Sequence, residues 1–458
     1  MGKGISIHMK MEKPNVSGMR EEKTAKETVR PEALHIWEPP QEISLEEIIR
    51  MSKDVLAMPD IMTKTREDIF RMRVFEMDWD IGAMVYEPDD PSKIPTGPDG
   101  KKVGFFLLHG GTGDYKSLDP VARMITGKFG IKVANMTFPG RLYLLDPSRD
   151  WPADTLNPDG SVRTPLWTKE TRITQDQYEI IEDTSNRKKY GTFFSLMAKE
   201  GTEFYYRMAA WPVAFEEAMK ETCHRHFPED RYSVYAHGHS TGGPFIMILS
   251  QRVSNVAGIL GYGSVPFGYI FSEVTGKKWD FPFNYLRLRT WRDTARYAEE
   301  EFASKKHSLP VMMEVVLDRW EKEKKRANFK AEDFVHKNNT HSLAEAARVT
   351  ATRLKMGPKD MEDLIKKYVG YCRELSGPGV KPVPPVLSVH GIGDDTVTYN
   401  DCKKALPLFS AMNPQPKVRC VLLGAGVHRW AYTDDDLPCG VIPTVTKLWY
   451  EAIMAGCF

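Results

Sequence analysis

The sequence lacks the long apolar segments that would place a chain in a membrane. No run approaches 18 consecutive apolar residues, so we expect no transmembrane segment. The first 30 residues are polar and charged, and they lack the apolar core of a secretory signal. We therefore expect a cytoplasmic protein.

Cysteine is scarce and is not spaced for a metal ribbon or a redox pair. The six cysteines contain no C-x-x-C spacing. Without a secretion signal, we expect mostly buried, reduced thiols rather than disulfides.

Neither sign of charge is in excess. Lys and Arg total 63 and Asp and Glu total 62, which leaves a net charge of +1 at pH 7. This balance gives no electrostatic reason to bind nucleic acid or an anionic membrane, so we expect neither as a partner. The 458 residues, 41% of them hydrophobic, are enough for one large core that carries insertions.

Short apolar runs alternate with amphipathic segments along much of the chain. This alternation predicts an α/β fold, with a mostly parallel sheet covered by helices. The expected strands cover residues 103–108, 131–136, 234–236, 257–262, 386–389 and 418–423, and the expected helices 118–129, 202–227, 244–253, 402–410 and 442–454. Residues 71–86 alternate in the strand sense and predict two antiparallel strands, with Gly82 interrupting the pattern.

The start of the chain predicts an arm and one short helix. Residues 1–40 are charged and contain several prolines, so we expect a poorly ordered or loosely docked arm. Ser44 and Glu47 have the spacing of a capping box and predict the beginning of a helix.

Two segments are too long to be ordinary connections. Residues 142–200 are polar and aromatic and predict a functional excursion. Residues 265–383 are charged and helical in periodicity, and they predict a helical cap inserted into the sheet domain. We expect residues 1–65 to form the arm and short helix, 66–264 the first part of the core, and 384–458 its second part.

The clearest chemical motif lies around Ser240. Residues 238–242 read Gly-His-Ser-Thr-Gly, between an expected strand and an expected helix. A serine at the apex of such a turn needs glycine on either side, because a Cβ there would keep strand and helix apart. The pentapeptide alone is weak evidence, so its meaning depends on partners elsewhere in the chain.

Three other loops offer such partners. Asp394 and Asp395 follow the expected strand 386–389, and His428 follows the strand 418–423. His109-Gly110-Gly111 follows the strand 103–108 and supplies flexible backbone N–H groups. Because reacting groups in open α/β sheets collect at the carboxyl ends of strands, we expect these loops beside Ser240.

With these residues the sequence resembles the α/β-hydrolases over residues 100–265 and 384–458. The resemblance implies the α/β-hydrolase fold with Ser240 as nucleophile, His428 as general base and then acid, and Asp394 as the orienting carboxylate. It also implies an oxyanion hole formed by the backbone N–H groups of Gly111 and Thr241.

The choice of Asp394 over Asp395 also comes from the resemblance. The family pattern H-G-x-x-D-x-x-V matches His390, Gly391, Asp394 and Val397.

Structural roles explain the other histidines and aromatic residues near the expected site and in the insertions. For four histidines near the expected site we prefer structural hydrogen bonding over catalysis: His109, His237, His239 and His390. The spacing of the last three does not require a metal, so we expect no metal and no cofactor. Seven aromatic residues are expected in the cores of the two insertions, with substrate lining as the alternative: Trp151, Trp167, Trp279, Phe281, Phe283, Tyr285 and Trp291.

The predicted function is serine hydrolysis of a carboxylic ester or lactone in a small to medium organic metabolite, through an acyl-enzyme. An amidase or a C–C bond hydrolase with the same triad stays open, because leaving-group protonation depends on residues of the cap. A non-catalytic binding protein is the alternative from another class. The expected partner is a small-molecule ester-type substrate, and a homodimer stays open.

Overall fold

The computed structural model describes most of the sheet domain. It covers residues 36–74, 77–110, 114–144, 166–183, 193–199, 202–240, 242–264, 288–289, 381–394, 397, 399, 416–428, 430 and 436–456. All of them belong to one compact unit, His35–Phe458. Within the described residues, no helix is both long and apolar enough to cross a membrane.

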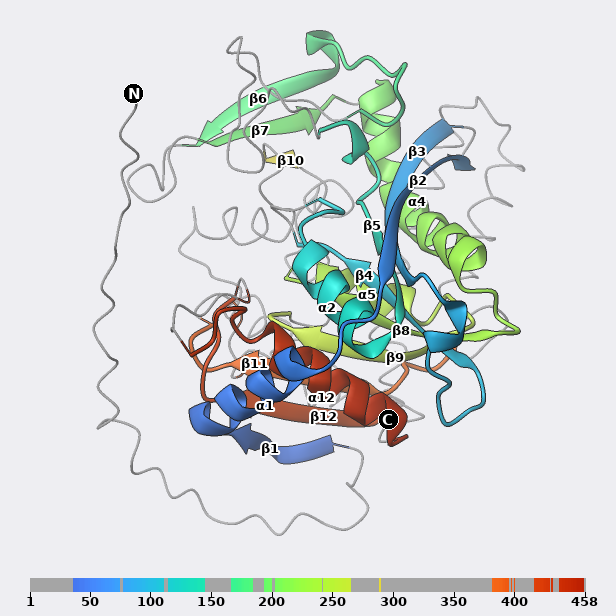
Figure 1. The fold of residues 1–458 in the computed structure, drawn as a ribbon. Coiled ribbons are helices and arrows are strands. Elements are labelled where there is room, and N and C mark those ends of the chain that lie inside the picture. Colours follow the sequence, from blue (N-terminus) through green and yellow to red (C-terminus); the bar gives the residue numbers. More distant parts are fainter. Residues whose placement is uncertain are drawn as a thin grey trace, which may run out of the picture. The chain divides into compact units, whose positions relative to one another are not determined.

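A nine-stranded sheet is the centre of this unit (Figure 1). Its order is β1-β12-β11-β9-β8-β4-β5-β3-β2. The strands are β1 (Ile36–Ile43), β2 (Thr63–Val74), β3 (Met77–Pro88), β4 (Lys102–Leu108), β5 (Lys132–Met136), β8 (Tyr232–Gly238), β9 (Val256–Tyr262), β11 (Val386–Gly391) and β12 (Val418–Leu423). From β1 to β5 all neighbours in this order pair in parallel, and β3 and β2 continue the sheet in antiparallel.

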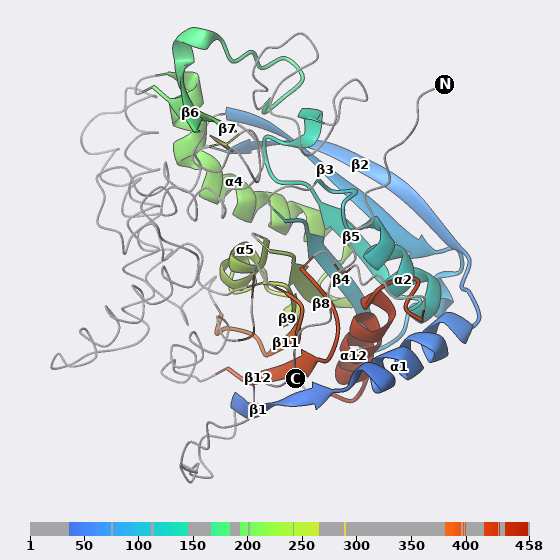
Figure 2. The ribbon, with the colours of Figure 1, turned by 90° about the vertical axis from the view of Figure 1, so that its left-hand side faces the viewer.

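Helices cover both faces of the sheet, as Figures 1 and 2 show. α1 (Leu45–Ala57), α2 (Asp119–Phe129) and α12 (Ile442–Met454) pack on one face, and α4 (Glu203–His226) and α5 (Gly242–Leu249) on the other. Three short 3-10 turns, η3 (Pro91–Lys93), η4 (Leu142–Leu144) and η5 (Gln175–Gln177), lie in the connections. The predicted mostly parallel, helix-covered sheet is confirmed. Its central strands are buried on both faces, which explains their continuous apolar runs.

The two antiparallel strands predicted around residues 71–86 are present, but Gly82 does not interrupt either of them. β2 and β3 pair antiparallel from Thr63 opposite Pro88 to Val74 opposite Met77, and Gly82 lies within β3. A Cβ at Gly82 would lie 2.5 Å from Cδ1 of Leu142. The glycine therefore makes room for a neighbouring side chain instead of ending the strand.

The amino-terminal segment is more ordered than predicted. Residues 36–40, expected in a loose arm, belong to β1, which pairs with β12 at the edge of the sheet. The register shifts between Trp37 and Gln41, where two prolines without N–H groups interrupt the pairing. The predicted cap of α1 is present, since Ser44 Oγ accepts from Glu47 N at 3.2 Å. The Glu47 carboxylate pairs with Arg50.

The two insertions share a second, three-stranded sheet that the sequence did not predict. β6 (Tyr178–Asp183) and β7 (Phe193–Ala198) belong to the first insertion, and β10 (Leu288–Arg289) belongs to the second. β10 pairs with β7, and β7 pairs with β6, all antiparallel. The rest of residues 265–380, with the aromatic residues expected there, lies outside the described residues, as does the expected helix 402–410. The helical cap stays a prediction.

Asp80 anchors residues 166–170 of the first insertion to the β2–β3 hairpin. Its carboxylate accepts from Arg71 Nε at 2.6 Å, from the Tyr143 hydroxyl and from Lys169 N at 3.1 Å. Trp167 is buried beside Trp79, with ring centroids 5.1 Å apart. Trp167 is therefore a core residue, whereas Trp151 lies outside the described residues.

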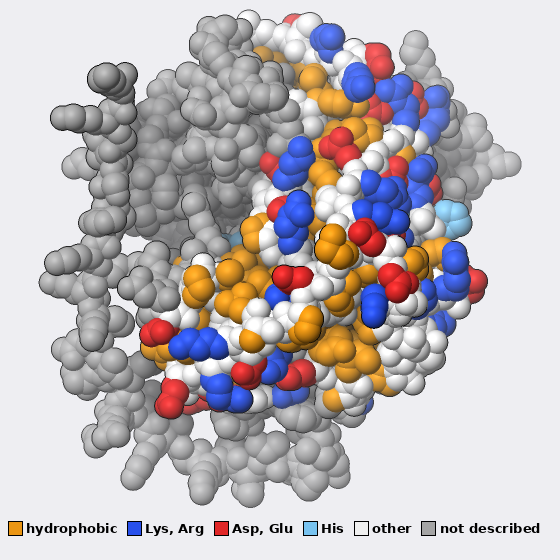
Figure 3. Space-filling model, in the orientation of Figure 1, with side chains coloured by type: hydrophobic (Ala, Val, Ile, Leu, Met, Phe, Trp, Pro, Cys, Tyr) orange, Lys and Arg blue, Asp and Glu red, His pale blue; other side chains and the backbone are white. Residues whose placement is uncertain are grey.

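On the face shown in Figure 3, the described residues do not gather charge of one sign. In Figure 3, acidic and basic side chains are interspersed over the helices and over the β2–β3 hairpin. Of the six cysteines, Cys223 and Cys420 are buried free thiols and Cys439 is a partly exposed one.

Candidate active site

Ser240 lies at the apex of a tight turn between β8 and α5. Its φ of 49° is in the left-handed region, which is rare for a residue other than glycine. A Cβ at Gly238 would lie 2.1 Å from the Gly242 carbonyl oxygen, and one at Gly242 would lie 2.6 Å from that of His109. The glycines on both sides of Ser240 are thus required by close backbone contact.

Asp394 and His428 form a hydrogen-bonded pair on the loops after β11 and β12. His428 Nδ1 lies 3.1 Å from Asp394 Oδ2, and the two side chains are 16% and 1% exposed. The other carboxylate oxygen of Asp394 accepts from Val397 N at 2.8 Å. Asp394 is therefore fixed from both sides, while His428 remains open to solvent or to a ligand.

The serine turn and this pair meet around Gly263, which follows β9. Ser240 N donates to the Gly263 carbonyl oxygen at 2.9 Å. A Cβ at Gly263 would lie 3.2 Å from His428 Nδ1 and 3.3 Å from Asp394 Oδ2. All three predicted triad residues are thus brought to one edge of the sheet.

These groups occur along the chain in the order Ser240, Asp394, His428, each just after a parallel strand of the same sheet. That order, on a mostly parallel sheet with a strained strand–serine–helix turn, is the arrangement of the α/β-hydrolase architecture. The chain has the α/β-hydrolase fold. Within the α/β-hydrolase fold, the residues discussed above lie at the edge where reacting groups collect.

Comparisons with known proteins give only distant likenesses. No protein-family model and no curated protein matches the chain. Among solved structures, it is similar to dienelactone hydrolase from Anabaena variabilis ATCC 29413, with 10% identity, 85% of this chain and 98% of that one covered, and a TM-score of 0.34. It is also similar to proline iminopeptidase from Mycobacterium smegmatis, with 13% identity, 85% and 100% covered, and a TM-score of 0.35.

A third similar structure is a bacterial brefeldin A esterase, a homologue of human hormone-sensitive lipase. The two sequences are 10% identical, the match covers 90% of this chain and 85% of the esterase chain, and the TM-score is 0.34. The chain order of Ser240, Asp394 and His428 and the serine turn, not these likenesses, assign the α/β-hydrolase fold.

The loop after β4 lies directly against the serine turn. A Cβ at Gly110 would lie 3.2 Å from the Cβ of Ser240. The buried ring of His109 holds this loop, because Nε2 accepts from Phe138 N at 3.1 Å and Nδ1 donates to the Gly110 carbonyl oxygen at 2.7 Å. Burial, together with the nearby Arg141, lowers the pKa of His109 well below its usual range, so the ring is neutral.

The two residues predicted to form the oxyanion hole, Gly111 and Thr241, lie outside the described residues. The oxyanion hole therefore stays a prediction.

Two further histidines make the structural hydrogen bonds expected of them. His237 Nδ1 lies 2.7 Å from the Leu260 carbonyl oxygen, and His390 Nε2 lies 2.8 Å from Ser388 Oγ. Burial lowers the pKa of His237 to about 4. Among the described residues, no three His, Cys, Asp or Glu side chains converge to hold a metal ion.

His239, expected to make a structural hydrogen bond, has Nδ1 3.4 Å from the Tyr262 carbonyl oxygen. Two aromatic residues near it, Tyr262 and Trp430, were not singled out from the sequence. The ring of His239 lies 4.9 Å from that of His428, and the rings of Tyr262 and Trp430 are stacked 4.2 Å apart. Trp430 has a φ of 65°. The only signal in the sequence for Trp430 is that it lies two residues after His428.

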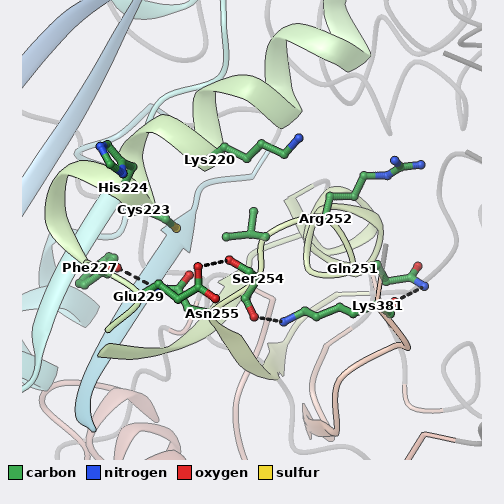
Figure 4. Close-up of a pocket in the computed structure, with 11 residues that line it drawn as sticks. Lys220, Cys223, His224, Phe227, Glu229, Gln251, Arg252, Ser254, Asn255 and Lys381 are labelled. Carbon is green, nitrogen blue, oxygen red and sulfur yellow. Dashed lines mark hydrogen bonds between the residues drawn. The ribbon is translucent and has the colours of Figure 1, made fainter. Parts of the chain in front are cut away.

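A cavity of about 540 Å³ lies elsewhere in the fold (Figure 4). Its walls include Phe227, Asn255 and Lys381, which precede β8, β9 and β11 respectively, so the cavity is at the edge opposite Ser240.

The cations of this cavity already have partners. Lys220 and Arg252 lie 2.7 and 3.6 Å from the carboxylate of Glu216, and Lys381 Nζ donates to the Ser254 carbonyl oxygen at 3.1 Å. We assign no ligand to it.

Proposed function

We propose that the protein is a serine hydrolase that cleaves a carboxylic ester or lactone through an acyl-enzyme. The observation that carries this proposal is the hydrogen bond between His428 and the buried Asp394, beside a serine on a strained turn. A carboxylate can only accept, so the Nδ1 atom of His428 holds a proton and its Nε2 atom is the basic one. That tautomer is the one in which the imidazole can take a proton from a serine hydroxyl.

The proposed reaction has two halves. Ser240 Oγ attacks the substrate carbonyl while His428 accepts its proton, because a serine hydroxyl is a poor nucleophile near neutral pH. His428 then protonates the leaving alcohol, and the acyl group stays on Ser240. Water, activated by the same imidazole, releases the acid.

In this proposal, the N–H groups of Gly111 and Thr241 stabilise the tetrahedral oxyanion. Each such donor is worth about 3 kcal/mol of barrier. The contact of Gly110 with Ser240 supports this role for the loop after β4.

We propose that the two insertions enclose the substrate. The pairing of β10 with β7 supports this, because it joins Leu288–Arg289 of the second insertion to a strand of the first. An enclosed site excludes water and favours a small or medium-sized substrate. Emulsified long-chain lipid should therefore be hydrolysed much more slowly than small soluble esters, and equal rates would contradict the enclosure.

Turnover of p-nitrophenyl acetate and covalent labelling by a fluorophosphonate test the chemistry. We expect labelling of the wild-type protein and none of Ser240→Ala, with Ser264→Ala as a control that keeps the label. A folded wild-type protein that takes no label would refute the hydrolase and favour a binding role. Parallel assays with a p-nitroanilide and with a C–C hydrolase substrate would decide between ester, amide and carbon–carbon cleavage.

A further inference from the structure

One carbonyl group in the loop that carries His428 has two donors. The Val427 carbonyl oxygen, in the peptide bond just before His428, accepts two hydrogen bonds. The Tyr262 hydroxyl donates to it at 2.9 Å, and Trp430 N donates to it at 3.0 Å. Any movement of this peptide would move the imidazole with it.

The two donors are themselves packed against each other. The rings of Tyr262 and Trp430 are stacked at 30° with centroids 4.2 Å apart, and both side chains are buried. Trp430 keeps a left-handed backbone, which persists only where surrounding contacts determine it. The ring of Trp449 and the stacked Tyr262 supply such contacts.

A glycine lets the loop approach the tyrosine. Gly426 has a φ of 107°, and a Cβ there would lie 2.7 Å from the Tyr262 hydroxyl oxygen. The Gly426 carbonyl oxygen accepts from Gly393 N at 3.0 Å, which ties the loop of His428 to the loop of Asp394.

The Tyr262 hydroxyl remains a donor throughout the usual assay range. Burial, reinforced by the nearby charge of Asp394, raises the pKa of Tyr262 above its ordinary value. The hydroxyl therefore keeps its proton, and its hydrogen bond to Val427 does not depend on pH.

We propose that Tyr262 and Trp430 are positioning residues that hold the Val427–His428 peptide so that the imidazole stays between Asp394 and Ser240. This inference rests on the proposed function of His428. Neither residue needs to touch the substrate, since both act through the loop.

Tyr262→Phe is the sharpest test, because it removes only the hydroxyl and keeps the stacked ring. A displacement of about 1 Å can cost about 100-fold in rate. We expect kcat to fall 10- to 100-fold while KM stays within twofold, and the rate of fluorophosphonate labelling to fall in parallel. Tyr232→Phe, at the opposite end of β8, removes the hydroxyl of another largely buried tyrosine and should leave kcat unchanged.

Trp430 gives a second, independent test. Trp430→Phe keeps an aromatic ring for Tyr262 and should retain kcat within about threefold. Trp430→Gly removes the ring and should lower kcat as much as Tyr262→Phe does. A purely structural role would lower the urea midpoint and leave the kcat of the folded fraction unchanged.

The outcomes separate the two proposals. If the wild-type protein is labelled and Tyr262→Phe is labelled and turns over at the same rate, the positioning role is wrong and the hydrolase stands. If the wild-type protein takes no label, the hydrolase fails and the positioning role fails with it.

Discussion

His428 Nδ1 lies 3.1 Å from Oδ2 of Asp394, and the carboxylate of that pair is almost completely shielded from solvent. Because the second oxygen of Asp394 accepts from Val397 N, the carboxylate cannot turn away from the imidazole. The pair therefore fixes both the orientation and the tautomer of His428.

Replacing Asp394 by Asn should lower kcat for a soluble ester by about 10³- to 10⁴-fold, because the amide favours the wrong tautomer of His428. Steady-state kinetics on the purified variant measure this. Asp395→Asn is the matched control and should keep kcat within a few-fold. If Asp395→Asn loses the activity and Asp394→Asn keeps it, the carboxylate has been misassigned.

Gly238→Ala should prevent the serine turn from forming, since the new Cβ would lie 2.1 Å from a backbone oxygen that cannot move aside. We expect little soluble protein, or a loss of several kcal/mol in the free energy of unfolding measured with urea. Gly127→Ala is the contrasting change, because nothing lies within 4 Å of a Cβ at that position in α2. It should stabilise the protein by about 0.5–1 kcal/mol. A stable Gly238→Ala protein would show that the turn is looser than the structure indicates.

Asp80→Asn should release residues 166–170 from the β2–β3 hairpin. Burial disfavours the charge of Asp80, but hydrogen bonds from Arg71, Tyr143 and Lys169 outweigh it and lower its pKa. Weakening these hydrogen bonds should lower the free energy of unfolding by about 1–2 kcal/mol and speed proteolysis near Lys169. Asp78→Asn, on an exposed residue 3.5 Å from Arg73, should change stability by no more than about 0.5 kcal/mol. If Asp80→Asn and Asp78→Asn lowered stability equally, Asp80 would not be the anchor of residues 166–170.

Acid should destabilise the fold through His237. Burial lowers its pKa in the folded protein to about 4, whereas the unfolded value is about 6.5. Between these values the unfolded chain binds the proton and the folded protein does not, so this stabilisation is present above pH 6.5 and is lost towards pH 4. The loss attributable to this one residue is at most about 3 kcal/mol.

Urea unfolding at pH 7, 6, 5 and 4 measures this effect. The slope of the unfolding free energy against pH gives the number of protons taken up on unfolding, and His237→Asn should reduce that number by about one over this range. His224→Asn, on an exposed residue, should leave the slope unchanged. An unchanged slope in His237→Asn would mean that another group carries the acid sensitivity.

The core elements could be predicted from the sequence because their local signals agree with their surroundings. The run at β4 is apolar because both faces of that strand are buried, and the amphipathic pattern at α12 matches the bounds Ile442–Met454. Gly82, β1 and the strands of the insertions were not predicted. In each, a contact with a distant segment decides the structure: Leu142 against Gly82, β12 beside β1, and β7 beside β10.

The sequence by itself determined the order of the strands and helices and the identity of Ser240, Asp394 and His428 as candidates, because strand periodicity and turn glycines are local properties. Only the tertiary structure decided that these candidates meet around Gly263, and that Tyr262 and Trp430 both donate to the Val427 carbonyl oxygen. Residues 262 and 427 are far apart in the chain, and their hydrogen bond exists only because β9 and β12 are brought into the same sheet by burial of their apolar faces.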